Sequence, residues 1–377
     1  MRFLKGAKQQ MSQSISALPV KAKVKDTGTT YYGVPIIWEI GDKNHAGYPA
    51  NSVTLVAANI LKLACFDAKE SGNSDSSRRN YGNNRYSLSN LRQWLNKAGS
   101  PWYQAQHGAD AAPTNANVWS NYNEYDDEAG FLTGFSAQML AAILNTTLTV
   151  AKASVDGGGS ETVTDRVFLL SKAEVGLGAE NGVSEGSTLA MFSDNASRQC
   201  RPTAQAVSNS EYTNSSLSAS QPWWYWLRSP NASYSYSVRY VYSDGTLSRG
   251  SASYGHDGVR PALYLKSDIS VSLDGDDEST IEVSEEELYK AAVQKFGERA
   301  QILVAIEEMS ELTKALLKYI RHEDFNQGDY DDIVESIAEE RADVSIMLNQ
   351  LAVIFGKNED AETEKLEHLA DIVKDAL

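Results

Sequence analysis

The chain has 377 residues and a formal net charge of −16 at pH 7, and this charge is unevenly distributed. Residues 1–270 carry 24 basic and 22 acidic side chains, whereas residues 271–377 carry 10 basic and 28 acidic ones. The acidic second part argues against direct binding of a nucleic-acid backbone, because phosphate groups would be repelled. The two cysteines lack CxxC spacing and the five histidines form no HxH or HExxH pattern, which argues against a zinc site.

The N-terminal stretch lacks the apolar core of a signal peptide. No stretch of the chain approaches the about 18 apolar residues that are needed to span a bilayer. We therefore expect a soluble, cytoplasmic protein with no membrane partner.

The first part of the chain predicts a domain of short strands and loops. Residues 1–29 are polar and predict an N-terminal arm, and strand-like segments such as VPIIWEI and SVTLVAANIL begin within residues 30–272. RVFLLS at 166–171 predicts a buried strand, and short helices are expected after Ser89 and Ser136, which suit N-caps. Few helices and many short strands are typical of an irregular α+β domain.

The last hundred residues predict a different fold. A linker is expected over 273–283, where turn-forming and acidic residues offer nothing to bury, and Ser284 with Glu287 has the spacing of a capping box. Helical spacing then predicts an all-α four-helix bundle over 284–377. The four predicted helices cover residues 285–296, 298–321, 331–355 and 360–376.

Two pairs of carboxylates lie on the second and third of these predicted helices. Glu308 with Glu311, and Glu340 with Asp343, are each spaced i and i+3, which places both members on one helical face beside apolar residues. If the two helices pack, the carboxylates converge and repel one another. A hard divalent cation such as Mg²⁺, which prefers oxygen ligands, would remove that cost. The alternative interpretation is a solvated acidic helix face.

Three basic residues follow the first carboxylate pair at roughly one-turn intervals: Lys314, Lys318 and Arg321. They are candidates for contacts with substrate phosphates. The alternative is ordinary charge compensation with the nearby glutamates.

The pattern E-x-x-E, 28 further residues and E-x-x-D, within IEEMSELTKALLKYIR and EERADVSIMLNQL, resembles the MazG-like all-α nucleoside triphosphate pyrophosphohydrolases. The resemblance covers roughly residues 285–377. It implies Mg²⁺, with Mn²⁺ as the alternative ion, bound by Glu308, Glu311, Glu340 and Asp343. It also implies a helical dimer or tetramer and hydrolysis of nucleoside triphosphates to the monophosphate and pyrophosphate. The metal would polarise the α-phosphate and activate a water. Glu307 is a candidate to accept the proton of that water, or else a surface acid.

A segment rich in serine and tyrosine precedes the linker. Residues 229–255 contain eight Ser, five Tyr, three Gly and one Asn, a composition typical of antibody paratopes. Tyrosine supplies large contact area at low entropic cost, and Ser and Gly allow loops to adapt. The alternative is a Ser/Tyr-rich edge of a β-domain without a special function.

The flanking motifs WWYWLRSP and GVRPALYLKSD, together with VPIIWEI, SNLRQWLN and VFLLSKAEVG, resemble the variable proteins of diversity-generating retroelements. The resemblance implies a C-type-lectin-like fold of the formylglycine-generating-enzyme kind over residues 30–272, an unidentified macromolecular ligand, and a phage or prophage source. Val238 and Val241 would then point inward, and the SDG at 243–245 would form a hairpin turn. The display positions implied are Tyr234, Tyr236, Arg239, Tyr242, Arg249, Ser251, Ser253, Tyr254 and His256.

Two functional hypotheses follow. In the first, a diversified binding domain is joined to an active, Mg²⁺-dependent nucleotide pyrophosphohydrolase. In the second, the protein only binds a ligand, and the helical bundle is a catalytically idle oligomerisation module.

Overall fold

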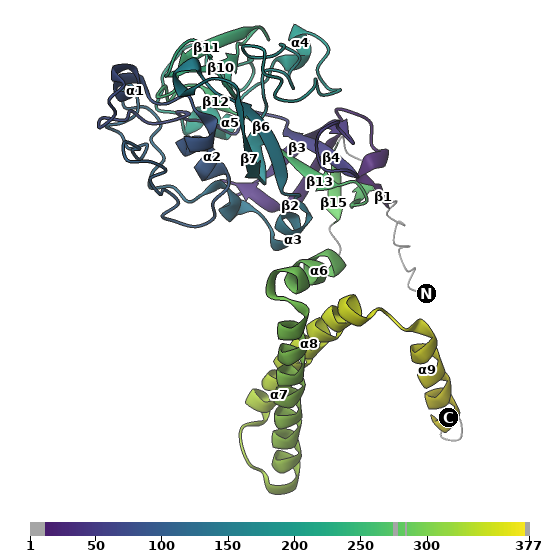
Figure 1. The fold of residues 1–377 in the computed structure, drawn as a ribbon. Helices are drawn as coiled ribbons and strands as arrows, with labels where there is room; N and C mark the ends of the chain where they lie inside the picture. Colours follow the sequence, from purple (N-terminus) through teal and green to yellow (C-terminus); the bar gives the residue numbers. More distant parts are fainter. Residues whose placement is uncertain (1–11, 274–277, 283–284, 374–377) are drawn as a thin grey trace, which may run out of the picture. The chain divides into compact units, whose positions relative to one another are not determined.

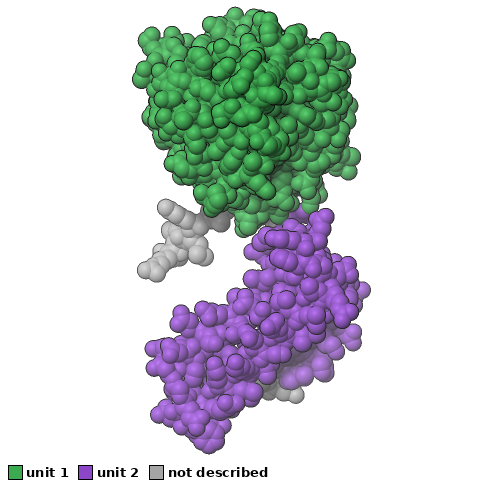
Figure 2. Space-filling model, turned by 60° about the vertical axis from the view of Figure 1, so that its left-hand side comes forward, with its two compact units in different colours: residues 1–283 green, residues 284–377 purple. Residues whose placement is uncertain are grey.

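The computed structural model describes residues 12–273, 278–282 and 285–373. The chain divides into two compact units, residues 1–283 and residues 284–377, which are coloured separately in Figure 2. The boundary falls at the sharp change in charge and in secondary structure. Each unit is described below by itself.

The first unit is built on an eight-stranded sheet in the order β1-β14-β15-β2-β3-β4-β13-β8 (Figure 1). Its neighbouring strands are antiparallel, apart from the parallel pair of β15 with β2. The fully buried β4 lies near the middle of this sheet. The strands are β1 (Ser12–Ser14), β2 (Lys23–Tyr31), β3 (Val34–Lys43), β4 (Ser52–Ala57), β8 (Val167–Leu169), β13 (Pro261–Lys266), β14 (Ser270–Leu273) and β15 (Glu278–Glu282).

A five-stranded sheet in the order β11-β10-β9-β12-β5 and a two-stranded β6-β7 hairpin complete the β-structure of this unit. The five-stranded sheet carries the segment rich in serine and tyrosine on β10 and β11. The strands are β5 (Lys62–Leu63), β6 (Thr146–Ala151), β7 (Ser160–Asp165), β9 (Tyr225–Pro230), β10 (Ser237–Val241), β11 (Leu247–Ser251) and β12 (Gly258–Val259).

The expected N-terminal arm and linker are only partly correct. Of the predicted arm, residues 1–11 lie outside the described residues, but β1 and most of β2 come from it and belong to the large sheet. Of the predicted linker, residues 278–282 form β15, which pairs with both β14 and β2. Backbone pairing with distant strands orders both segments, although their side chains offered little apolar surface to predict it.

The helices of the first unit are short, and the two that were predicted begin after their expected N-caps. The hydroxyl of Ser89 accepts a hydrogen bond from the backbone of Arg92, and that of Ser136 accepts one from Met139. The second helix is shorter than its sequence pattern because strand β6 begins soon after it. The helices are α1 (Ser76–Tyr81), α2 (Asn90–Leu95), α3 (Ala137–Ala142), α4 (Asn195–Arg198) and α5 (Ala204–Ser208).

The second unit contains the four predicted helices, α6 (Glu285–Phe296), α7 (Glu298–Phe325), α8 (Tyr330–Phe355) and α9 (Glu359–Val373). Ser284 of the predicted capping box lies outside the described residues. The main packing is an α7–α8 hairpin, to which α6 adds further contacts. All side chains of residues 360–373 are exposed, so within one copy of the chain α9 does not complete the predicted bundle. None of the described helices is long and apolar enough to cross a membrane.

A fully buried ion pair joins the two larger sheets of the first unit. The Arg228 guanidinium on β9 makes two hydrogen bonds to the Glu174 carboxylate, at 2.6 and 3.0 Å, and both side chains are 0 % exposed. The same guanidinium donates to the carbonyl oxygen of Leu169, on β8 of the large sheet, at 3.0 Å. It also donates to the carbonyl oxygen of Glu185 at 2.7 Å and to the hydroxyl of Tyr48 at 3.2 Å. A buried charge is tolerated only with partners of this kind.

Arg228→Met should therefore reduce the free energy of unfolding of the first unit by about 3–5 kcal/mol, because Glu174 would stay buried without its cation. Urea unfolding followed by tryptophan fluorescence would measure the loss. Arg85→Met is the matched control, since the Arg85–Glu161 pair is partly exposed and should contribute less than about 1 kcal/mol. Equal losses in the two variants would contradict the role assigned to Arg228.

Candidate functional site

The structure brings together three of the four carboxylates that were predicted to bind metal. Glu308 on α7 and Glu340 with Asp343 on α8 each offer an oxygen, and these oxygens lie within 4.8 Å of one another. We call these three residues the carboxylate cluster. Glu308 and Glu340 are half-buried and Asp343 is exposed. The cluster forms because the i, i+3 pair of α8 faces α7 where the two helices pack.

The remaining predicted acids lie outside this cluster. Glu311 and Glu307 are exposed, and neither of them contributes an oxygen to the group of three. Their charges still act on Glu308, whose pKa is raised by partial burial and by the neighbouring carboxylates, with Asp343 the strongest of these. A raised pKa means that the ionised form of Glu308 is disfavoured in this arrangement.

The carboxylate cluster has no basic partner among the described residues: no Lys or Arg there forms an ion pair with any of its members. Carboxylate oxygens on two packed helices are the ligands that Mg²⁺ and Mn²⁺ accept. The donor set of the chain therefore fits a hard divalent cation.

Two of the three predicted phosphate-binding residues lie together, but away from the cluster. Lys318 and Arg321 line a pocket of about 360 Å³ at the turn between α7 and α8, which Asp329 and Asp332 also line. Lys318 is ten residues from Glu308, which corresponds to about 15 Å along the helix. Lys314 is exposed and does not line this pocket.

The Ser/Tyr-rich segment forms the β10–β11 hairpin around the expected turn at 243–245. Val238 and Val241 are 0 % exposed and so are inward anchors. The turn at 243–245 is confirmed, with the Gly245 amide donating to the Tyr242 carbonyl oxygen at 2.9 Å. Gly245 has a φ of +83°, and a Cβ there would meet the Asn195 carbonyl oxygen, so this position requires glycine.

The predicted display positions differ in exposure. Tyr234 and Tyr242 are 40 % and 38 % exposed, Arg249 is exposed, and its guanidinium lies 4.6 Å from the Tyr234 ring centre. Tyr236, Tyr254 and His256 are half-buried.

Three display positions do not behave as expected. Ser251, the last residue of β11, and Ser253, which follows the strand, are buried, so they cannot present their side chains. Arg239 is half-buried and forms two hydrogen bonds of 2.9 Å to Glu180, so it anchors the hairpin to the neighbouring loop. Glu180 also pairs with Lys172 at 3.1 Å, and its pKa is lowered by Arg239 and its other hydrogen-bond donors against the opposing effect of burial.

Aromatic side chains from outside the segment extend the tyrosines into one continuous series, which sequence reasoning missed. Tyr81 of α1 lies 5.0 Å from Tyr236 between ring centres, and Trp119 lies 5.9 Å from Tyr81 and 5.7 Å from Tyr254. We call this series the aromatic row; its members are Tyr234, Tyr236, Tyr81, Trp119, Tyr254 and His256. No local pattern marks Tyr81 or Trp119, because the fold alone brings them beside the hairpin.

His256 ends the aromatic row in a crowded site. Its ring stacks between Tyr212 and Tyr254, with centroid distances of 4.8 and 4.9 Å, and burial lowers its pKa to about 4. Asp257, beside it, is 1 % exposed, and neither carboxylate oxygen accepts a hydrogen bond from the described residues. Burial raises the pKa of Asp257, which favours its neutral form.

Of the three tryptophans in the WWYWLRSP motif, Trp223 and Trp226 are buried. Trp224 is only partly buried and stacks on Tyr242 at 5.5 Å.

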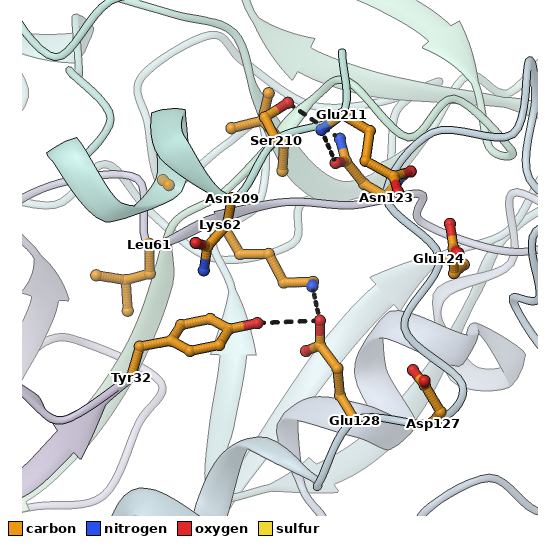
Figure 3. Close-up of a pocket in the computed structure, with 12 residues that line it drawn as sticks. Tyr32, Leu61, Lys62, Asn123, Glu124, Asp127, Glu128, Asn209, Ser210 and Glu211 are labelled. Atoms are coloured by element: carbon orange, nitrogen blue, oxygen red, sulfur yellow. Dashed lines mark hydrogen bonds and ion pairs between the residues drawn. The ribbon is translucent and has the colours of Figure 1, made fainter.

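A separate pocket of about 210 Å³ lies in the first unit (Figure 3). Lys62 and Tyr32 both point toward Glu128, which pairs with the lysine and accepts a hydrogen bond from the Tyr32 hydroxyl at 3.2 Å. Two hydrogen bonds join Asn123 and Glu211. The Asn123 backbone amide donates to the Glu211 carboxylate at 2.9 Å, and the Glu211 backbone amide donates to the Asn123 side-chain oxygen at 2.8 Å. The charge of Lys62 is therefore balanced by an ion pair within this pocket.

Comparison with known protein families found a match within the first unit. No curated protein and no solved structure matches the chain. The family model described as a domain of unknown function (DUF6273) matches residues 51–267. These residues run from β4 to β13 and include the aromatic row. Since the match covers more than half of the chain, this protein belongs to the DUF6273 family.

Proposed function

We propose that the protein is a ligand-binding protein whose helical unit hydrolyses nucleoside triphosphates to monophosphates and pyrophosphate. The observation that carries the enzymatic part is the convergence of Glu308, Glu340 and Asp343 from two packed helices within 4.8 Å, with no ion pair to a lysine or arginine of the described residues. Like charges held this close are costly unless a cation binds them.

Mg²⁺ fits the carboxylate cluster, with Mn²⁺ as the alternative ion. Glu308, Glu340 and Asp343 would hold it, and Glu311 lies one helical turn beyond Glu308 on α7. When bound, the cation would neutralise charge on the phosphate chain and polarise the phosphorus–oxygen bond under attack.

The chain's own residues have separate roles in this proposal. Glu307 would accept the proton of the attacking water at its carboxylate. Lys318 and Arg321 would bind the part of the nucleotide furthest from the carboxylates, because their pocket is about 15 Å along α7 from Glu308. The substrate would therefore extend along α7. The MazG-like pattern at 285–377 supports the same assignment.

The binding part of the proposal concerns the first unit. We propose that residues 30–272 are a C-type-lectin-like variable domain, and that the aromatic row contacts a macromolecular ligand. Tyr, Trp and Arg dominate the energetics of protein interfaces, and rigid rings lose little entropy on binding. Tyr234, Tyr242 and Arg249 supply exposed groups of this kind.

We also propose that the helical unit assembles into a dimer or tetramer. Apolar side chains on α7 are about half-exposed in a single copy, among them Leu303, Ile306, Leu317 and Ile320. Leu303 and Ile306 are three residues apart, and so are Leu317 and Ile320. At the helical repeat these four side chains lie along one side of α7. Monomeric proteins rarely expose apolar surface of this extent, and a second copy of the same hairpin would cover it.

The first prediction from this proposal concerns catalysis. Wild-type protein with Mg²⁺ should release pyrophosphate from at least one member of a panel of NTPs and dNTPs, and chelation should abolish the release. Glu308→Gln should reduce the rate by at least about 10-fold, because a ligand of the cation is lost. Glu298→Gln, an exposed change on the same helix, should leave the rate unchanged. Background release from all three proteins would favour an idle helical module.

The second prediction concerns the binding surface. A display library randomised at Ser233, Tyr234, Tyr236, Tyr242 and Arg249 should remain folded and yield binders to at least one of three probe proteins, lysozyme, serum albumin or streptavidin. A control library randomised at the buried residues Val238, Val241 and Ser253 should lose its folded fraction. If the first library folds but gives no binder to any probe, the surface is not a general binding surface.

The third prediction concerns assembly. Leu317→Glu should convert the assembled protein to a smaller species in sedimentation velocity, because a charge would be buried in the shared apolar surface. Val155→Glu is the matched control: it makes the same kind of change at a 60 % exposed position of the first unit, and should leave the sedimentation coefficient unchanged. A monomeric wild-type protein would contradict the assembly proposal.

A further inference from the structure

The loop between β9 and β10 carries Tyr234 and Tyr236, and one buried side chain contacts its backbone at three points. The Asn84 side chain is 0 % exposed, and its amide nitrogen lies 3.2 Å from the carbonyl oxygen of Asn231, 2.6 Å from that of Tyr234 and 2.9 Å from that of Ser237. Three carbonyl neighbours require the donor end of the amide at this position. The two N–H groups of one side chain thus hold both ends of the loop and its middle.

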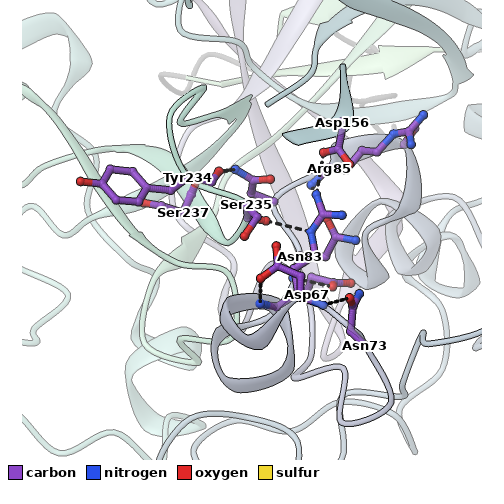
Figure 4. Close-up of polar contacts among 12 residues, drawn as sticks. Asp67, Asn73, Asn83, Arg85, Asp156, Tyr234, Ser235 and Ser237 are labelled. Carbon is purple, nitrogen blue, oxygen red and sulfur yellow. Dashed lines mark hydrogen bonds and ion pairs between the residues drawn. The ribbon is translucent and has the colours of Figure 1, made fainter. Parts of the chain in front are cut away.

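A second attachment lies next to the first. The Asn84 backbone amide donates to the Ser235 carbonyl oxygen at 3.2 Å, and the Arg78 Nε donates to the same oxygen at 3.1 Å. Asp156 holds the Arg78 guanidinium at 2.6 Å, and both of these side chains are nearly buried. Figure 4 shows Tyr234, Ser235 and Ser237 of the loop beside the segment that carries Asn83.

These attachments end on backbone carbonyl oxygens, not on side chains of the loop. The same holds at two other points of the hairpin and its flank. Arg198 donates to the Gly245 carbonyl oxygen at 2.8 Å, and Asn123 donates to that of Gly255 at 2.5 Å. A scaffold that holds the backbone in this way keeps its contacts when the outward side chains change, because every residue offers the same carbonyl group.

We infer that Asn84 is a positioning residue of the binding surface, assisted by Arg78: it fixes the loop so that Tyr234 and Tyr236 are presented in one conformation. This inference rests on the proposed binding function of the aromatic row. A surface ordered before its ligand arrives loses less conformational entropy on binding, so affinity depends on Asn84 although Asn84 makes no contact with the ligand.

Hydrogen exchange tests the inference without a ligand. Asn84→Asp keeps the shape of the side chain but removes the donor, and it should speed exchange of the amides of Asn231, Ser233 and Tyr234 by at least about 10-fold, since two hydrogen bonds of about 1 kcal/mol each are lost. Exchange in β13 should stay unchanged. Tyr234→Ser is the matched control and should change loop exchange by less than about 2-fold, because the carbonyl contacts persist.

Arg78→Met provides a second variant if Asn84→Asp does not fold, and it should speed exchange in the same loop by a smaller factor. Unchanged loop exchange in these variants would overturn the inference. Equal acceleration of the loop and β13 would also overturn it, since it would show only a general loss of stability.

The effect on binding is measured with a binder to lysozyme, serum albumin or streptavidin. This binder is selected from the randomised surface library, in which Asn84 is unchanged. Introducing Asn84→Asp into that binder should weaken its affinity by at least about 10-fold. Unchanged affinity would overturn the inference. If no binder emerges from any library, the proposed binding function fails, whereas the exchange measurement still decides the role of Asn84.

Discussion

The buried Arg228–Glu174 pair is the constraint on which the first unit depends. Arg228 lies on β9, and its guanidinium reaches the β8 carbonyl of Leu169, so one charged group fixes the five-stranded sheet against the eight-stranded sheet. Such a group is stable only when each of its partners is in place. The chain that leaves β9 forms the loop held by Asn84 and then the hairpin. The position of the aromatic row is therefore set by a charge deep in the core.

The two units surround certain carboxylates with different charges. In the first unit, partly or fully buried carboxylates such as Glu174 and Glu180 have arginine partners, Arg228 and Arg239. In the helical unit, Glu308, Glu340 and Asp343 lie close together, and no lysine or arginine of the described residues is paired with them. A buried carboxylate is tolerated when a basic partner balances its charge, whereas several carboxylates held close together without such a partner would be stabilised by a bound cation. This contrast supports a binding role for the second set.

The sequence predicted features that depend mainly on residues close together in the chain. The four helices of the second unit and the N-caps at Ser89 and Ser136 followed from spacing and residue type, and the inward valines of β10 were implied by the family resemblance. What the sequence could not predict depends on distant pairing. The strands β1 and β15 are ordered by backbone hydrogen bonds to remote strands, and Tyr81 joins Tyr236 across more than 150 positions. The grouping of Glu308 with Glu340 and Asp343 was predictable, but the pocket that Lys318 and Arg321 line with residues of α8 depends on how the two helices pack at their turn.

The two units divide the physical requirements of the proposed function between them. A diversified surface must accept new side chains without new strain, and attachment through carbonyl oxygens meets that condition, because it does not depend on side-chain identity. A nucleotide site must keep its few carboxylates fixed, and rigid helices meet that condition. The carboxylate cluster and the aromatic row lie in different units of the chain. A small tyrosine surface binds weakly alone, so assembly through the helical unit would raise its effective affinity by multivalency. In the proposed function, variation would be confined to the unit whose backbone attachments tolerate it.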